Sequence, residues 1–171
     1  PNVGGSDTRV DSPLSAYLDA LDRLMDLRGR AGGSARADLG SAAWRSFPGH
    51  GSTVALRPRI EEIREHHVER LRAVLRALPE ADAAENGTSG AKETVGGETS
   101  GRTPWQVACE LFGEMRGIHA KMGAGEAAAH LGFGGGAGLA VRIGSEPDRY
   151  VRAAEVTDEE IVLAVSASRY K

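Results

Sequence analysis

A single histidine held between glycines is the first place in this sequence where chemistry could be done. His50 stands in the run Phe47-Pro48-Gly49-His50-Gly51, just ahead of a strongly helical segment. Glycines on both sides permit positive φ and let another group approach closely, and Pro48 fixes φ before the turn. A short loop of this kind directs one imidazole, which suits a metal ligand or a catalytic base. It also suits an ordinary tight turn that carries an exposed histidine, so both interpretations stay open.

The remaining histidines are not spaced to complete a metal site around His50. They are His66, His67, His119 and His130. His66 and His67 are adjacent within a predicted helix, so their side chains diverge by about 100° and cannot chelate one metal ion together. A zinc ion takes three or four protein ligands, so a single histidine does not hold it. The chain by itself is therefore expected to be inactive and to bind zinc weakly.

Two amphipathic helices are predicted to frame this loop. In the first, residues 12–27, apolar side chains recur at the i, i+3, i+4, i+7 spacing of a helix that buries one face. Pro13 suits the first helical position, with Ser12 or Asp11 as the N-cap. The opposite face is expected to meet water, and its charged residues are Asp19, Asp22, Arg23 and Asp26.

The second helix is predicted over residues 58–78 and has the clearest pattern in the sequence. Pro58 is expected to be its first residue, and one apolar face runs along it and includes His67. Between the two helices, residues 28–43 are rich in Gly, Ala, Ser and Arg without a period, which predicts a loop. Residues 44–47 then predict a short strand that leads into the histidine loop.

A polar stretch separates these helices from the rest of the chain. Residues 79–102 contain Asn86-Gly87 and Gly96-Gly97 and almost no large apolar side chains. Such a composition cannot bury enough apolar surface to order itself. This stretch is predicted to be a flexible linker and a domain boundary.

The last third of the chain predicts two helices, a hairpin and a final helix. Thr103-Pro104-Trp105-Gln106 is a capping box that starts the first helix. The second helix is expected to start near Gly123 and to stop in the glycines at 134–136. An antiparallel hairpin follows over residues 139–151. A second capping box predicts a helix over 158–168, with a strand over the apolar run 161–165 as the alternative. Helix, helix and hairpin in this order are typical of a winged-helix domain.

Four features taken together resemble the C-terminal half of a metallo-β-lactamase-fold hydrolase. They are Pro1-Asn2-Val3-Gly4, the helix that starts at Pro13-Leu14, the run Pro48-Gly49-His50-Gly51, and Arg59-Ile60 followed by His66-His67. The pattern is most similar to the subgroup that is related to glyoxalase II and carries an added winged-helix domain. The resemblance covers most of residues 1–152. The family's main zinc motif, HxHxDH, does not occur here, so the sequence is expected to be a fragment that lacks its first half.

The resemblance implies a fold class and a division of the chain. The fold class is α+β and mostly helical. Residues 1–78 would form the C-terminal portion of a metallo-β-lactamase αββα fold, with a loop insertion at 28–43. Residues 79–102 would be the linker, and residues 103–171 a winged-helix-like domain with a C-terminal helix.

The same resemblance implies a site and its partners. His50 matches a zinc ligand of the family, and His66 and His67 match positions near the mouth of the active site, on the substrate side. Zinc is expected in the intact parent, whose implied reaction is hydrolysis of a thioester- or ester-type bond by metal-activated water. The implied partners are the missing N-terminal half, with the remaining zinc ligands, and a small-molecule acyl substrate. A homo-oligomer stays open.

Composition limits the other functions. The net charge is only −3, and residues 124–131 carry Glu126 but no Lys or Arg, so nucleic acid is not an expected partner. A nucleic-acid-binding or ribonuclease-associated module and a non-catalytic interaction domain remain the alternatives. The lone Cys109 rules out an internal disulfide and fits a cytoplasmic protein. No apolar run approaches the roughly 18 residues that span a membrane, so no membrane partner is expected.

Overall fold

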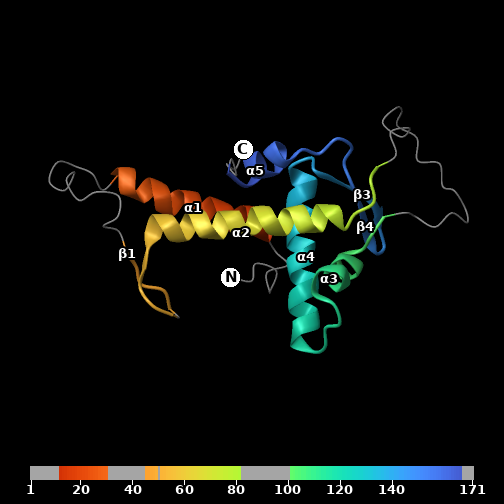
Figure 1. The fold of residues 1–171 in the computed structure, drawn as a ribbon, viewed down its shortest axis with the longest axis horizontal. Helices are drawn as coiled ribbons and strands as arrows, with labels where there is room; N and C mark the ends of the chain where they lie inside the picture. Colours follow the sequence, from red (N-terminus) through yellow and green to blue (C-terminus); the bar gives the residue numbers. More distant parts are fainter. Residues whose placement is uncertain (1–11, 31–44, 50, 82–100, 167–171) are drawn as a thin grey trace, which may run out of the picture.

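The computed structural model describes residues 12–30, 45–49, 51–81 and 101–166. Two long helices, α1 (Pro13–Arg30) and α2 (Leu56–Arg76), lie side by side, and α4 (Ile118–Gly136) crosses them (Figure 1). α3 (Pro104–Phe112) packs on α4, and α5 (Asp158–Ser166) returns to α2. The described part is mostly helical with two small sheets, so the predicted α+β class is confirmed.

The first helix follows its predicted apolar stripe. Leu14, Leu18 and Leu21 are buried in the core. Ser12 Oγ accepts a hydrogen bond from the backbone N–H of Ser15 at 3.4 Å, as an N-cap residue does. The prediction that Asp19 faces water is wrong, because its side chain is only 8% exposed. α4 as well as α2 packs against α1, so the buried face is wider than the leucine stripe.

A very short sheet precedes α2. β1 (Arg45–Ser46) pairs antiparallel with β2 (Val54–Ala55), and Ser46 lies opposite Val54. The strand predicted over residues 44–47 is therefore confirmed at Arg45 and Ser46. Most of the predicted loop at 28–43 lies outside the described residues, while residues 28–30 belong to α1.

α2 starts earlier than the sequence suggested. Its first residue is Leu56, so Pro58 is the third residue of the helix rather than the first. Proline is accepted there because the N–H groups of the first turn have no partner within the helix. The predicted apolar face is buried, and Val68 beside it is buried as well. The predicted residues that are buried are Ile60, Ile63, His67, Leu71, Val74, Leu75 and, just after the helix, Leu78.

α3 begins with the predicted capping box, whereas α4 is longer than expected. Gln106 N donates to Thr103 Oγ1 at 3.2 Å, and Thr103 N donates to Gln106 Oε1 at 2.8 Å. α4 begins at Ile118, well before Gly123, and continues through the glycines to Gly136. Glycine disfavours helix, so the helical state of this last turn depends on packing against neighbouring elements.

The predicted hairpin and final helix are confirmed. β3 (Ala140–Ser145) pairs antiparallel with β4 (Asp148–Arg152), with Val141 opposite Val151. Before α5, Glu160 N donates to Thr157 Oγ1 at 3.2 Å and Thr157 N donates to Glu160 Oε2 at 2.8 Å, which completes the second capping box.

The second edge of β4 carries two other stretches of backbone. Arg152 N donates to Pro79 O at 2.7 Å, and Ala81 N donates to Arg152 O at 2.8 Å. Arg102 and Tyr150 exchange two N–H···O bonds, each of 2.9 Å. The two ends of the predicted linker are thus attached to the same strand, and residues 82–100 between them lie outside the described residues.

None of the helices in the described ranges is both long enough and apolar enough to cross a membrane.

Candidate functional site

Two histidines from different helices meet in the interior of the molecule. His67 lies on α2 and His130 on α4, and they are 1% and 0% exposed. His67 Nδ1 and His130 Nε2 are 3.2 Å apart, which is a hydrogen-bond distance. Buried polar groups need partners, so each imidazole satisfies one nitrogen of the other.

The hydrogen bonds around this pair fix the tautomer of both rings. His130 Nδ1 lies 2.8 Å from the backbone oxygen of Glu126. A carbonyl oxygen only accepts, so His130 Nδ1 carries the proton and its Nε2 is the acceptor. His67 Nδ1 must then donate to His130 Nε2, which leaves His67 Nε2 without a proton. This nitrogen is buried and has no hydrogen-bond partner among the described residues.

An ion pair lies one helical turn from the histidines. The Nε of Arg70 on α2 is 2.8 Å from a carboxylate oxygen of Glu126 on α4. The same guanidinium lies over the ring of Phe112 on α3, with its central carbon 4.7 Å from the ring centre, a cation–π distance. Three helices therefore meet at this point through one arginine.

The surroundings of the histidines disfavour their charged forms. Burial lowers the pKa of His67 from 6.5 to about 3, and the neighbouring His130, His66 and Arg70 add to this effect. Burial also lowers the pKa of His130, although its hydrogen bond to Glu126 O and the Glu126 charge oppose the shift. Tyr17 of α1 meets His67 edge to face, with ring centres 5.7 Å apart. Both imidazoles are therefore neutral at physiological pH.

An open cavity of about 590 Å³ lies beside the Arg70–Glu126 pair, between α3 and α4. Its walls are Phe112, Glu114, Met115, Arg116, His119, Met122, Gly123 and Glu126. A methyl group added at Gly123 would lie only 2.3 Å from Met115 Sδ, so Met115 packs directly on the backbone of α4. His119 is exposed.

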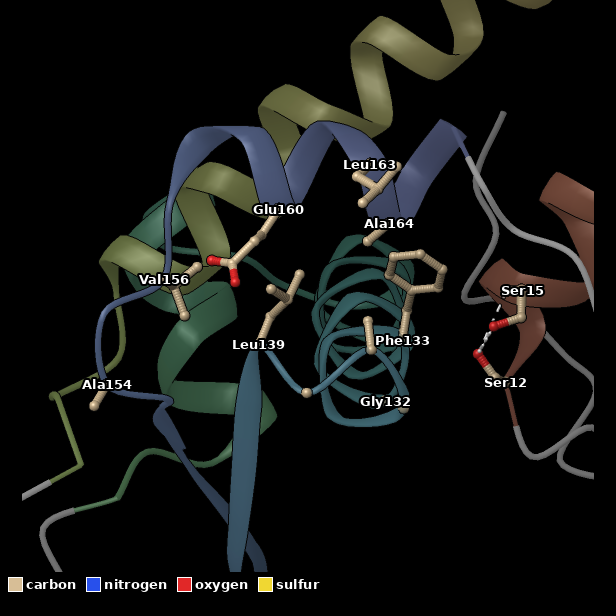
Figure 2. Close-up of a pocket in the computed structure, with 13 residues that line it drawn as sticks. Ser12, Ser15, Gly132, Phe133, Leu139, Ala154, Val156, Glu160, Leu163 and Ala164 are labelled. Carbon is tan, nitrogen blue, oxygen red and sulfur yellow. Dashed lines mark hydrogen bonds between the residues drawn. The ribbon is translucent and has the colours of Figure 1, made fainter. Parts of the chain in front are cut away.

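A second cavity, of about 470 Å³, lies where α4 ends. Figure 2 shows it between the last turn of α4, the start of β3 and α5, with the first residues of α1 on one side. Its polar groups are already engaged: Ser12 and Ser15 hydrogen-bond each other at 2.7 Å, and Glu160 serves as the cap partner of Thr157. The Thr157 hydrogen bonds also lower the pKa of Glu160. No free acid, base or nucleophile is presented by the described lining.

The residues that the sequence singled out lie in different environments in the structure. His50 lies outside the described residues. His66 is exposed on α2, and its ring centre is 5.3 Å from that of His67, which is buried. His130 was not proposed as a site residue, because its partner lies 63 positions away in the sequence and no local pattern links them. A histidine in an apolar helical stripe on each of two predicted helices was the only signal.

The described residues do not form a zinc site by themselves. No three of their His, Cys, Asp or Glu side chains are grouped so that they could hold a metal ion. The two buried histidines use their facing nitrogens on each other. A zinc ion bound near these helices would therefore need ligands from outside the described ranges.

Comparison with solved structures shows which known fold the chain resembles. The chain is similar to a metallo-beta-lactamase family protein from Thermus thermophilus, with 29% sequence identity and a TM-score of 0.57. It is also similar to a beta-lactamase domain protein from Burkholderia ambifaria, with 27% identity and a TM-score of 0.56. Each comparison covers 89% of this chain and 37% of the other protein. No protein-family model and no curated protein matches the sequence.

These likenesses define the class of fold. The chain has a metallo-β-lactamase-like fold, which is a hydrolase-type fold, and it spans little more than a third of the length of the two proteins it resembles.

Proposed function

We propose that the chain is the C-terminal segment of a zinc-dependent metallo-β-lactamase-fold hydrolase that cleaves thioester- or ester-type bonds with metal-activated water. The observation that carries the proposal is the likeness to a metallo-beta-lactamase family protein and to a beta-lactamase domain protein, each over 89% of this chain. The motif around His50 supports the same assignment, since it matches a zinc-ligand loop of that family. We assign the whole protein to the cytoplasm, in line with the single cysteine of this chain.

In this proposal the described helices form the wall next to the reaction centre rather than the centre itself. His50 would be one zinc ligand, and the other ligands would come from the part of the parent outside this chain. Zinc, when bound, supplies hydroxide from water at neutral pH. His66 is the better candidate for a substrate-side role, because it is exposed whereas His67 is enclosed by α1 and α4.

We assign residues 103–152 to a winged-helix-like domain that supports the catalytic part instead of reading nucleic acid. Helix, helix and hairpin occur in the expected order. The ion pair between Arg70 and Glu126 and the bond between His67 and His130 join this portion to α2. These contacts suit a structural extension of the hydrolase fold.

The test is metal analysis combined with turnover of an acyl thioester and an aryl ester, made on the full-length protein that contains this chain. His50→Ala is expected to lower the zinc content and to abolish most of the turnover. His119→Ala is the matched control, since it removes an exposed histidine remote from His50 in sequence, and it should keep both. If His50→Ala retains its zinc and its rate, the proposed ligand role is wrong.

A second comparison separates the substrate-side role from the ligand role. His66→Gln should keep the zinc content of the full-length protein but raise the KM for the acyl substrate. An unchanged KM would remove His66 from the substrate side and leave the metal assignment intact.

A further inference from the structure

The contact between α2 and α4 joins two parts of the molecule. We name it the α2–α4 seam and define it by His67 and Arg70 on α2, Phe112 on α3, and Glu126 and His130 on α4. α1 packs against both α2 and α4, and α3 packs closely on α4. Beyond the polar pairs, Leu71 and Leu75 of α2 reach the backbone of α4 at Gly134.

At the seam each imidazole donates a hydrogen bond to the next group, and one ring nitrogen, His67 Nε2, has no partner among the described residues. His67 Nδ1 donates to His130 Nε2, and His130 Nδ1 donates to the Glu126 carbonyl. Both Nδ1 atoms already carry protons and His130 Nε2 is already an acceptor, so His67 Nε2 is the one nitrogen of the two rings that can take another proton. Its new N–H would be buried, and no acceptor for it exists among the described residues.

The groups that face His67 would not offset a positive charge on its imidazole. α1 presents the aromatic ring of Tyr17, and α2 presents His66 and the cationic Arg70. α4 presents His130 and the carboxylate of Glu126, which is already paired with Arg70. A proton on His67 would therefore place a buried charge beside a cation, which is costly.

α4 is also the helix least able to stand without its neighbours. Six of its nineteen residues are glycine, and each glycine disfavours a helix interior by up to about 1 kcal/mol relative to alanine. These positions are 123, 125, 132, 134, 135 and 136. Most of the stability of α4 must come from burial against α1, α2 and α3.

We propose that the His67–His130 hydrogen bond is an acid-released clasp: protonation at His67 Nε2 opens the α2–α4 seam and frees α4 from α2 before the other helices unfold. This device is independent of the proposed hydrolase function, because it uses only residues of the described chain.

The first experiment is hydrogen exchange on the chain at pH 7.5 and pH 5.0, corrected for the intrinsic pH dependence of amide exchange. At pH 5.0 the α4 amides should exchange through an opening that leaves the α2 amides protected, so protection in α4 should be at least tenfold lower than protection in α2. Equal protection in all helices at pH 5.0 would mean that exchange occurs through global unfolding and would overturn the clasp. Unchanged protection in α4 would overturn it too.

A matched double variant is designed to keep a hydrogen bond between positions 67 and 130 and to remove both titratable imidazoles. In His67→Asn combined with His130→Gln, an amide N–H replaces Nδ1–H and an amide oxygen replaces the acceptor nitrogen. Its α4 protection should be the same at both pH values. The control is His119→Gln, which removes an exposed histidine three helical turns before His130 on α4, and it should behave like the unmodified chain. A double variant that keeps the original pH dependence overturns the proposal.

A nuclear magnetic resonance titration of the unmodified chain gives the answer even if the double variant does not fold. The ring signals of His67 and His130 should stay unchanged through pH 6.5 and should change only together with the backbone signals of α4. Titration of either ring near 6.5 with α4 unchanged would show that the pair accepts a proton without opening, and the clasp would be overturned.

Discussion

Arg70 of α2 and Glu126 of α4 form an ion pair of 2.8 Å whose side chains are 25% and 18% exposed. The pair is more enclosed than a surface salt bridge, and breaking it leaves the other charge partly desolvated. The backbone of Glu126 has a separate task, because its carbonyl accepts the hydrogen bond from His130. Substitution of the Glu126 side chain therefore tests the ion pair without removing the acceptor of the histidine chain.

Glu126→Ala and Arg70→Met are expected to destabilise the chain, with a coupling free energy of about 1–3 kcal/mol in a double-mutant cycle. Arg70→Met keeps an apolar stem over Phe112, so loss of packing is limited. Urea unfolding of the two single variants and the double variant measures the coupling. A coupling near zero would mean that the pair contributes no more than an exposed one.

The histidine pair predicts that stability falls on mild acidification. The folded pKa of His67 is about 3, below the unfolded value of 6.5. The unfolded chain therefore binds the proton first, so stability is complete above pH 6.5 and declines as pH falls toward 3. From pH 7 to pH 5 the lowered pKa of His67 alone should reduce the free energy of unfolding by about 2 kcal/mol, and the lowered pKa of His130 acts in the same direction.

Chemical denaturation at several pH values measures this dependence. The His67→Asn/His130→Gln variant should lose most of the slope between pH 5 and 7, whereas His119→Gln should retain it. A slope of the same size in the double variant would assign the acid sensitivity to other groups.

Leu131 offers a direct test of the packing that supports α4. Its side chain is fully buried, so Leu131→Ala should cost about 2–5 kcal/mol of stability. Leu163 on α5 is 64% exposed, and Leu163→Ala should change stability by no more than about 0.5 kcal/mol. Thermal and urea melts compare the two. Similar effects in both would contradict the assignment of α4 to the core.

The two capping boxes should contribute similar amounts. Thr103→Ala and Thr157→Ala each remove the acceptor for one N–H of the first turn, at α3 and α5 respectively. Each should cost about 1 kcal/mol, and Thr→Ser at the same positions should cost less because the hydroxyl remains. If the Ser variant is destabilised as much as the Ala variant, the hydroxyl group does not account for the stability that the threonine contributes.

Features that depend on neighbours in the sequence were predictable, and those that depend on distant contacts were not. The capping boxes at Thr103 and Thr157 and the hairpin turn are local, and the structure confirms them. The burial of Asp19 was missed, because a helical stripe does not reveal that a second helix covers its margin. The early start of α4, five residues before Gly123, was missed because glycines disfavour helix unless tertiary packing overrides them, whereas its end within the glycines at 134–136 was predicted.

The same distinction between local patterns and contacts of distant residues applies to the candidate site. The His50 loop is a local pattern and could be singled out, and its role remains a prediction, since His50 lies outside the described residues. The partnership of His67 with His130 arises only when α2 crosses α4, so periodicity could place each histidine on an apolar face but could not join them.

The attachment of two backbone segments to one edge of β4 has a practical consequence. Ala81 bonds to Arg152 and Arg102 bonds to Tyr150, two residues apart along the strand, so the chain leaves and returns within about 7 Å. The cost of closing a loop between two points already held together rises only slowly with its length. A foreign folded domain inserted between residues 82 and 100 would therefore be held at both ends by the hydrogen bonds that Ala81 and Arg102 make to β4. By the same geometry, separately expressed pieces ending and starting there would have a strand edge on which to reassemble.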